Sequence, residues 1–402
     1  MKNIIIALLV LWFIPLRGQE VYTAEDSVAL NSDTASMSTT LGGYGNAYYQ
    51  RNLNQKYSKV NFERFVLFMG HKFNKKISLF SELEVEDAKI SGAEEGGELA
   101  LEQCYLKFRS SPKAYFVVGL FIPAIGILNE THLPNTYNGI ERTEVETNII
   151  PSTWRELGIG YYGKLDRAPI SFSLGLMNGL NSAQFEHGFV IRKGRMEGRK
   201  AGANNMAVTG ALQFYKNNFR AQISGYYGGS VALEATVADT LKLHAGSWGT
   251  PVMLAEVDLQ HEMKGFSVRF LATFISIPDA ASINQAFNNN TPKTACGAYA
   301  ELAYNIFASM KKQSLKALTF FVRYEILDMN NSIPANGIID PTLQQQHVIS
   351  GINYLPVKNV VIKADMHWKN AGARNPLLIY NPVASVYQKN TNFLNLGIGY
   401  SF

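Results

Sequence analysis

The sequence predicts an all-β protein, namely a transmembrane antiparallel β-barrel of about 16 strands, and three observations favour this fold class. First, residues 392–402 alternate between large apolar side chains and Asn, Gly or Ser, so one face suits hydrocarbon and the other suits water. Second, similar alternating segments of roughly ten residues recur from Thr39 to this end of the chain. Third, short turns and long polar loops connect these segments in strict alternation, as they do in closed single-chain barrels.

The composition agrees with one continuous architecture. Of the 402 residues, 47% are hydrophobic and only 17% are charged, against about a quarter in average soluble domains. No linker divides the chain, and after the first residues no apolar stretch approaches the roughly 18 residues of a membrane helix. The formal net charge of +5 is too small a bias to indicate nucleic-acid binding. Cys104 and Cys296 are far apart and outside any CxxC pattern, so we expect two unpaired wall residues.

The N-terminal segments predict an exported protein. Residues 1–18 have the pattern of a secretory signal peptide, with Lys2, an apolar run over 4–16 and Gly18 before the expected cut. Residues 19–38 are small, acidic and polar, so we expect a short periplasmic segment, with a small helix or partial plug as the alternative. The barrel should then occupy residues 39–402, in the outer membrane of a Gram-negative bacterium.

The alternation places each strand in order along the chain. Short connections that contain Lys, Pro, Asn or Gly, such as residues 74–76 and 216–218, predict tight turns, and the longer polar connections predict loops. An even number of strands returns both ends of the chain to the same side of the membrane. Closure is required because an open edge in hydrocarbon would leave backbone groups unpaired, at a cost of several kcal/mol each. The expected strands are 43–51, 62–73, 77–87, 101–109, 115–122, 154–163, 170–178, 206–215, 219–227, 253–261, 266–275, 298–307, 318–328, 346–354, 360–368 and 392–402.

Strand parity assigns side chains to the lipid or to the lumen. In residues 170–176 the even positions are Ile, Phe and Leu, and the odd positions are Ser and Gly. Leu254 and Phe321 are apolar exceptions on the polar face of their strands. Trp154, Trp368 and several tyrosines near strand ends suit either an aromatic girdle at the membrane surface or ordinary strand packing.

Charged side chains within the strands are expected in the lumen, because a charge on the lipid face near mid-bilayer costs a few kcal/mol. Two interpretations remain open. The charges form ion pairs between neighbouring strands that stiffen the wall, or they form a segregated field that selects ions by sign and orients dipolar solutes. The candidate pore-lining residues are Arg64, Glu82, Glu84, Lys107, Arg109, Arg220, Glu256, Asp258, Arg269, Glu301, Arg323, Glu325, Lys363 and Asp365.

Two loops carry further candidates. The connection 123–153 contains three prolines and several apolar residues, so we expect an ordered loop that folds inward and narrows the pore. The basic loop 186–200, with Arg192, Arg195 and Arg199, suits a vestibule that attracts anions or a solvated surface that binds anionic polysaccharide. The candidate constriction residues in the first loop are Glu130, Glu141, Arg142, Glu144 and Glu146.

The region 119–163 resembles the third-loop region of porins of the phosphate-selective O and P type. The similar elements are a Gly-x-x-x-Pro-x-x-Gly pattern at 119–126, the pair Glu141-Arg142, and Ile150-Pro151 before Trp154. The resemblance implies a sixteen-stranded, trimeric passive channel that is narrowed by this loop. Phosphate selectivity in that family rests on lysine clusters at the constriction, whereas the loop here has Arg142 and no lysine.

These features predict a porin through which small hydrophilic solutes or ions, including anions, diffuse passively. Its partners would be outer-membrane lipid, lipopolysaccharide, the solutes and further copies in a homotrimer, but not nucleic acid. The alternative is a non-conducting barrel that acts as an adhesin or anchors surface polysaccharide.

Enzymatic motifs are missing from the sequence. The seven histidines form no HExxH pattern, and the chain has no nucleophile elbow and no P-loop. Asp365 and His367 share one face of a strand, which is the only hint of a barrel hydrolase. We therefore expect no enzymatic activity, no cofactor and no metal.

Overall fold

The computed structural model describes residues 37–87, 97–309, 316–378 and 387–402. These residues form 16 antiparallel strands that close into one barrel, in which every strand pairs with its sequence neighbours and β1 pairs with β16. The predicted fold class and strand number are therefore confirmed. The predicted signal peptide, residues 1–18, and most of the segment 19–38 lie outside the described residues.

The strands follow one another around the barrel, and short helices lie in the connections. No helix in the described ranges is long and apolar enough to cross a membrane. The strands are β1 (Ser38–Asn52), β2 (Tyr57–Lys72), β3 (Ile77–Glu86), β4 (Leu99–Ser111), β5 (Ala114–Phe121), β6 (Glu156–Lys164), β7 (Ile170–Asn178), β8 (Met206–Lys216), β9 (Phe219–Gly228), β10 (Val252–Met263), β11 (Phe266–Ser276), β12 (Thr294–Asn305), β13 (Ala317–Ser332), β14 (Gln344–Val357), β15 (Val360–Ala371) and β16 (Asn390–Ser401). The helical segments are η1 (Val145–Ile149), η2 (Ser182–Gln184), α2 (Val190–Gly194), α3 (Ala235–Thr240), α4 (Ala280–Phe287), η3 (Ile306–Ser309) and η4 (Pro341–Leu343).

Several strands are longer than the alternation alone predicts. β2 begins at Tyr57 rather than at residue 62, because Asn52 pairs with Tyr57 across a tight turn at residues 53–56. β1 likewise begins at Ser38, which pairs with Lys72. The side chains at these ends are mostly polar and break the alternation, but their backbone groups continue the hydrogen-bonded ladder.

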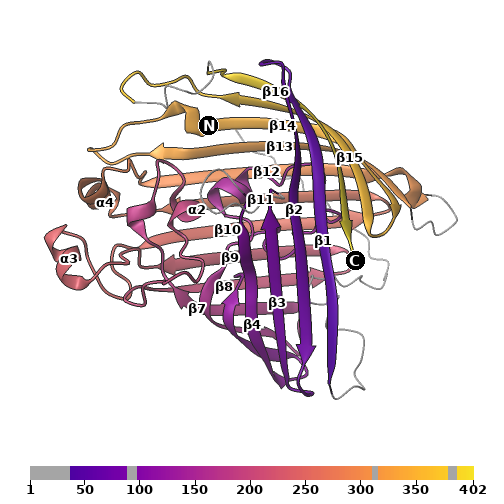
Figure 1. The fold of residues 1–402 in the computed structure, drawn as a ribbon, viewed down its shortest axis with the longest axis horizontal. Helices are drawn as coiled ribbons and strands as arrows, with labels where there is room; N and C mark the ends of the chain where they lie inside the picture. Colours follow the sequence, from indigo (N-terminus) through magenta and orange to yellow (C-terminus); the bar gives the residue numbers. More distant parts are fainter. Residues whose placement is uncertain (1–36, 88–96, 310–315, 379–386) are drawn as a thin grey trace, which may run out of the picture.

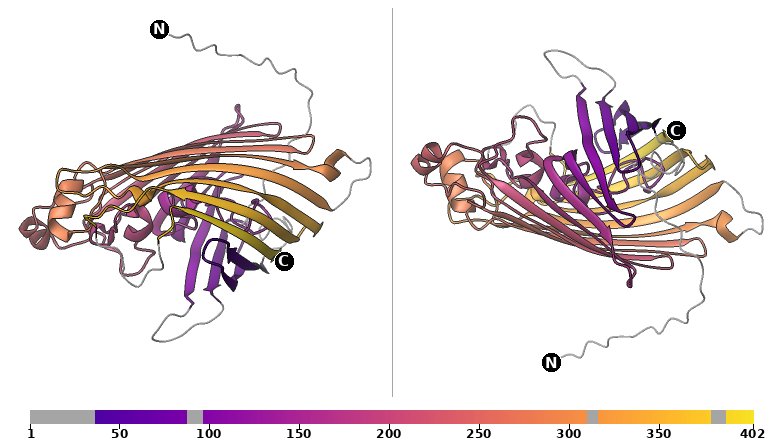
Figure 2. Two further views of the ribbon diagram at one scale, coloured as in Figure 1. Left: turned by 90° about the horizontal axis from the view of Figure 1, so that it is seen from above. Right: turned by 90° about the horizontal axis from the view of Figure 1, so that it is seen from below.

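The long loops lie at one end of the barrel, together with the tight turn at residues 53–56, and the other short turns lie at the opposite end. Figure 1 shows the barrel from the side, with α2, α3 and α4 at one end and the C-terminus at the other, and Figure 2 shows the same separation from above and below. The C-terminus lies beside a short turn, because the amide of Ser401 donates to the carbonyl oxygen of Asn359 at 2.9 Å. These two ends are called the loop end and the turn end below.

The two faces of the wall differ in character. On β13 the inward Arg323 and Glu325 are at most 3% exposed, although an open water-filled barrel would leave such charges accessible. Something other than water therefore covers much of the inner wall. The outward side chains of the same strand are apolar and 44–50% exposed, and they are Phe320, Val322, Tyr324 and Ile326.

Part of the barrel interior is an apolar core. Ile150 and Trp154, from the connection between β5 and β6, pack in one buried cluster with Leu254 and Leu271 of the wall. Phe321 belongs to a smaller buried cluster on the same inner face. The two apolar exceptions to parity are thus covered by protein rather than by water. Trp154 is fully buried, so it does not belong to an aromatic girdle.

The seam between β1 and β16 closes the barrel. Gly43 and Phe402 exchange two backbone hydrogen bonds, of 2.9 and 2.8 Å. The backbone packs closely at Gly43, where an added Cβ would lie 2.4 Å from the carbonyl oxygen of Val66 and 2.8 Å from the ring of Phe402. Only glycine fits this position without moving the neighbouring strand or the terminal aromatic ring.

Substitution of Gly43 should impair closure. We expect Gly43→Leu to reduce the yield of folded barrel severalfold, because the new side chain meets the backbone of β2, which has no room to move. The control is Ala47→Leu, four residues further along β1. The heat-modifiable mobility of refolded protein in electrophoresis measures the folded fraction, and equal yields for both variants would contradict the expectation.

Candidate functional site

The connection between β5 and β6, residues 122–155, lies inside the barrel and is called L3. Glu130 of L3 pairs with Arg220 on β9, and Glu141 accepts a hydrogen bond from Gln50 on β1 at 3.1 Å. These strands belong to opposite sides of the closed sheet. The side chain of Asn135 donates to the carbonyl oxygen of Lys358, in the turn between β14 and β15, at 3.2 Å. L3 therefore crosses the lumen and also reaches the turn end.

Charged wall residues hold the backbone of L3. Lys363 donates to the carbonyl oxygens of Tyr137 and Gly139 at 2.9 and 2.7 Å. The carboxylate of Asp365 accepts from the amide of Ile140 at 2.7 Å. The guanidinium of Arg323 donates to the carbonyl oxygens of Asn138 and Glu141, at 3.0 and 3.4 Å. The buried backbone N–H and C=O groups of such a loop need hydrogen-bond partners, and here the barrel wall supplies them.

Other wall charges pair with one another across neighbouring strands. Arg323 contacts the carboxylates of Glu301 and Glu325 at 3.3 and 2.8 Å. Arg220 lies between Asp258 and Glu130. Asp258 and Glu325 are both 0% exposed, so these are buried ion pairs rather than groups in open water. The ion-pair interpretation of the lumen charges therefore fits this region.

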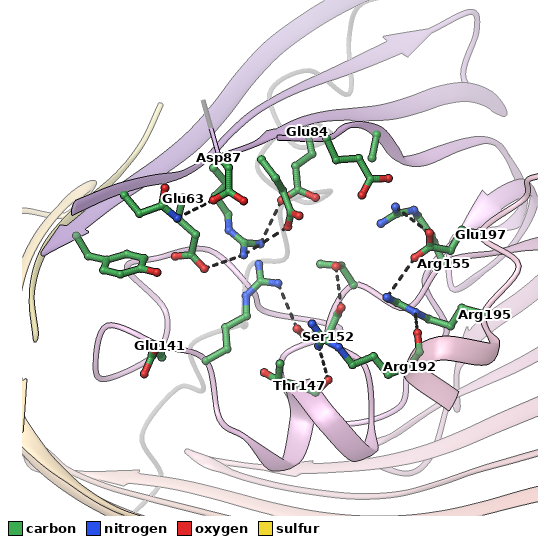
Figure 3. Close-up of a pocket in the computed structure, with 18 of the residues that line it drawn as sticks. Glu63, Glu84, Asp87, Glu141, Thr147, Ser152, Arg155, Arg192, Arg195 and Glu197 are labelled. Carbon is green, nitrogen blue, oxygen red and sulfur yellow. Dashed lines mark hydrogen bonds and ion pairs between the residues drawn. The ribbon is translucent and has the colours of Figure 1, made fainter. Parts of the chain in front are cut away.

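A cavity of about 560 Å³ remains between L3, the wall strands β1–β4 and the next long loop. That loop, residues 179–205 between β7 and β8, is called L4. Figure 3 shows the cavity, with Glu63, Glu84 and Asp87 on the strand side and Arg155, Arg192 and Arg195 on the loop side, where Glu141 and Glu197 also lie. The acidic side chains on or next to β2 and β3 are Glu63, Glu84, Glu86 and Asp87, and the arginines of L3 and L4 are Arg142, Arg155, Arg192 and Arg195.

Hydrogen bonds to the loops fix the arginines at the cavity. Arg192 donates to the carbonyl oxygen of Thr147 at 2.6 Å, which ties L4 to L3. Arg142 donates to the hydroxyl of Ser152 at 3.3 Å, but its buried Nε has no partner among the described residues. Arg195 contacts the carboxylate of Glu197 at 3.3 Å. On the strand side, the acidic row is partly neutralised, because Arg64 contacts Glu84 at 3.2 Å.

Three of the candidate constriction residues line the cavity, and two do not. Glu141, Arg142 and Glu144 border it. Glu130 is engaged with Arg220 instead. Glu146 lies inside the fold of L3, where it is 1% exposed and accepts from the amide of Leu128 and the hydroxyl of Tyr299, both at 2.7 Å. Burial raises the pKa of the Glu146 carboxyl above its usual range. The position of Glu146 differs from the prediction because η1 turns it back into the loop.

The remaining candidates divide by position. Of the wall residues, Arg64 and Glu84 border the cavity, while Lys107 lies toward the turn end with its ammonium 3.8 Å from the ring centre of Tyr115. Arg109 and Arg199 are exposed and are not part of the cavity lining. The other wall candidates have inward positions away from this cavity, and they are Glu82, Arg220, Glu256, Asp258, Arg269, Glu301, Arg323, Glu325, Lys363 and Asp365.

Strand parity missed inward residues at two irregularities of the sheet. The register between β3 and β4 shifts at Glu82 and Leu83, so Glu102 has no opposite residue there and is 0% exposed. The register between β1 and β2 shifts next to Glu63, so both Glu63 and its neighbour Arg64 border the cavity. Two consecutive charges within a strand were the only sequence signal of this second irregularity.

Among the residues that the structure describes, two groups of three side chains lie close enough to hold a metal ion. The first is Glu82, Glu102 and His132, and the second is Glu144, His347 and His367. In each group, one ligand atom per residue lies within 4.8 Å of the others. His132 and Glu144 belong to L3, and the other four residues belong to the wall. Both groups therefore join L3 to the inside of the barrel, on different sides.

A closed 16-stranded antiparallel barrel with an apolar outer face and a long loop inside has the architecture of outer-membrane porins. Three solved structures are similar in fold. The anion-selective porin from Comamonas acidovorans matches with a TM-score of 0.54 and 11% identity, over 91% of this chain and 100% of that one. OmpF of Salmonella typhi matches with a TM-score of 0.54 and 13% identity, over 90% and 97% of the two chains. OmpT of Vibrio cholerae matches with a TM-score of 0.53 and 11% identity, over 93% and 99%.

Sequence comparison gives a closer relative. The chain belongs to the same family as an uncharacterized protein of Aquifex aeolicus, to which it is 32% identical over 340 residues, 81% of this chain and 74% of that protein. No established family model matches the chain. The porin fold is therefore shared with proteins of very different sequence.

Removal of one buried wall cation should weaken the whole interior. We expect Arg323→Met to lower the free energy of unfolding by about 3–5 kcal/mol, because Glu301 and Glu325 would stay buried without their partner. L3 would also lose two hydrogen bonds. Unfolding by urea in detergent micelles, followed by the fluorescence of tryptophan, measures the change. The control is Arg109→Met, at an exposed position, and equal midpoints for the two variants would contradict the expectation.

Proposed function

We propose that the protein is an outer-membrane porin in which small hydrophilic solutes or ions diffuse past L3, along the cavity at β1–β4. The observation that carries this proposal is the cavity itself, a space of about 560 Å³. Its strand side is net negative despite Lys59 and Arg64, and its loop side is slightly net positive, because the four arginines there outnumber Glu141, Glu144 and Glu197. Opposed rows of charge in a water-filled constriction set up a transverse field. Such a field orients dipolar solutes and lets ions of both signs approach one wall.

The cavity limits the size and kind of solute. Because a water molecule takes up about 30 Å³, the space has room for a small solute with part of its hydration shell. Arg142, Arg192 and Arg195 would attract an anion, but Glu84 and Glu86 face the same space. Because both signs of charge face the cavity, we expect only weak selectivity between anions and cations. Phosphate selectivity, which the resemblance to the O and P type implied, fits the arginines but not the facing carboxylates or the lack of lysine in L3.

A second candidate function is a barrel that is closed at rest and acts as an adhesin or an anchor of surface polysaccharide. The observation that favours it is the cover that L3 gives to the inner wall, from the apolar core at the loop end to Lys358 at the turn end. Exposed Lys193, Arg199 and Lys200 on L4 would contact an anionic polysaccharide. A hydrolase has less support, because Asp365 is engaged by Ile140 and Asn395 rather than by His367.

The surroundings of the barrel belong to the same proposal. Lipid and lipopolysaccharide would cover the apolar outer face. A groove of about 610 Å³ in the wall contains Ala272, Ala298 and Ile326 together with the polar Asp328 and Gln346. Asp328 has the parity of the outward residues of β13, and a charge facing lipid is costly unless it is near the membrane surface or covered. A neighbouring copy in a trimer would provide such a cover.

Single-channel recording in a planar bilayer tests the two candidate functions. Stable open steps from refolded protein are the expected result for a porin. A folded wild-type protein without current, combined with a conducting variant in which residues 131–139 are replaced by Gly-Ser-Gly, would overturn the open porin and favour the closed barrel. Silence of both proteins would remove the support for any passage beside L3.

Charge substitutions at the cavity should shift ion selectivity in opposite directions. We expect Arg192→Gln to favour cations and Glu86→Gln to favour anions, each by about fivefold in the permeability ratio. One unit charge about 8 Å from an ion in water contributes about 0.5 kcal/mol, a factor of about two, and it acts with opposite sign on cations and anions, so the ratio changes by the square of this factor. Reversal potentials in a salt gradient measure the ratio. The control is Arg199→Gln, which removes an exposed charge outside the cavity, and equal shifts for Arg192→Gln and this control would contradict a passage through the cavity.

A further inference from the structure

Two buried histidines face each other on the inner wall. His347 lies on β14 and His367 on the neighbouring strand β15. They are diagonal neighbours, because His367 pairs with Ile349, two residues from His347. They are 0% and 4% exposed. The Nδ1 atom of His347 lies 2.8 Å from the Nε2 atom of His367. The proposed passage of solutes does not use this pair.

The other nitrogen of each ring faces an oxygen that accepts a hydrogen bond. Nε2 of His347 lies 3.2 Å from Oε1 of Gln345, and the amide nitrogen of Gln345 donates in turn to the carbonyl oxygen of Thr342, which fixes the orientation of this amide. Nδ1 of His367 lies 3.3 Å from a carboxylate oxygen of Glu141. Both outer nitrogens donate to these oxygens when each carries the single proton of its neutral ring.

This arrangement of protons leaves the facing nitrogens without hydrogen. A neutral imidazole carries one N–H, so Nδ1 of His347 and Nε2 of His367 then point lone pairs at each other over 2.8 Å. Two lone pairs at this distance repel. A positive species between them relieves the repulsion, and it is either an extra proton, which makes a buried imidazolium, or a metal ion.

A third ligand group lies beside the two rings. A carboxylate oxygen of Glu144, in L3, lies within 4.8 Å of one ring nitrogen of each histidine. Its orientation is fixed by Asn148, whose side-chain amide donates to Oε2 at 2.6 Å. Two imidazoles and one carboxylate form a donor set that suits borderline divalent metals, among them zinc, nickel and cobalt.

We propose that Nδ1 of His347, Nε2 of His367 and the carboxylate of Glu144 bind a divalent transition-metal ion of the zinc class. Zinc takes His and Glu ligands in a tetrahedron, and three protein ligands leave the fourth position to water. With bonds of about 2.0–2.1 Å, the two nitrogens would stand about 3.3 Å apart, so the rings need to separate by only about half an ångström. Gln345 and Glu141 have the role of outer partners, which fix the tautomer and the direction of each ring.

The metal would clamp L3 to the wall. Glu144 immediately precedes η1 and also borders the cavity, whereas both histidines belong to the barrel strands. A bound ion would therefore hold the cavity side of L3 against β14 and β15, in addition to the hydrogen bonds of Lys363 and Arg323. This inference does not depend on whether the barrel conducts.

Cobalt binding to the refolded full-length protein without a histidine tag tests the proposal. Co²⁺ serves as the probe because its visible absorption reports on nitrogen and oxygen ligation in a low-coordinate site. Apo protein, prepared with EDTA and dialysed, is titrated in detergent while total bound metal is counted. We expect His347→Asn combined with His367→Asn to lose one equivalent of bound Co²⁺ together with the visible band. Glu144→Gln should weaken binding at least tenfold, because it replaces a charged ligand with a neutral one.

Matched variants separate this site from other histidines. His244→Asn changes an exposed histidine in the loop between β9 and β10 and should leave the titration unchanged. His132→Asn disables the other three-residue group and should leave the band of the first site in place. Heat-modifiable mobility verifies that each variant is folded. The proposal is overturned if the wild-type protein binds no more Co²⁺ than the folded double variant, which is the result expected when a proton occupies the space between the histidines.

Discussion

The interior of this barrel depends on the rule that a buried charge needs a partner. Arg323 and Lys363 are at most 4% exposed, and each satisfies this requirement by binding backbone carbonyl oxygens of L3. The carboxylate of Asp365 does the same with the amide of Ile140. Neither the wall nor L3 is satisfied without the other, so the loop is part of the structure of the barrel rather than an addition to it.

Two kinds of packing divide the lumen and leave the cavity at one side. Toward the loop end, apolar residues of the loops and the wall form a continuous core. In the rest of the lumen, L3 is held by ion pairs and hydrogen bonds. At β1–β4 the wall carries an excess of carboxylates that L3 does not fully cover, and a register shift brings Glu63 to the same side as Arg64. The excess of wall carboxylates and the register shift between β1 and β2 thus both occur at the cavity.

The sequence predicts the barrel but only part of the arrangement in its interior. Period-two alternation predicts the number of strands and shows that side chains such as that of Arg323 point inward, because both follow from local strand geometry. Glu102 escapes this rule, since one extra residue in β4 reverses the parity before it. The contacts between L3 and the wall could not be predicted from the sequence for another reason. Glu141 and His367 are 226 residues apart, and no local pattern specifies which wall residue a loop will meet. The pair His347 and His367 looked scattered for the same reason.

The reach of L3 imposes an order on assembly. Ile140 and Asp365 are separated by 225 residues, and Lys363 and Asp365 lie on the strand before the last. Because the chain is synthesised from its N-terminal end, L3 is present long before the strands that hold its tip. Its backbone can gain these partners only when β15 has joined the sheet, close to the seam at which β1 meets β16. Docking of the loop therefore coincides with completion of the barrel, and a truncated chain would leave the same loop exposed to proteases.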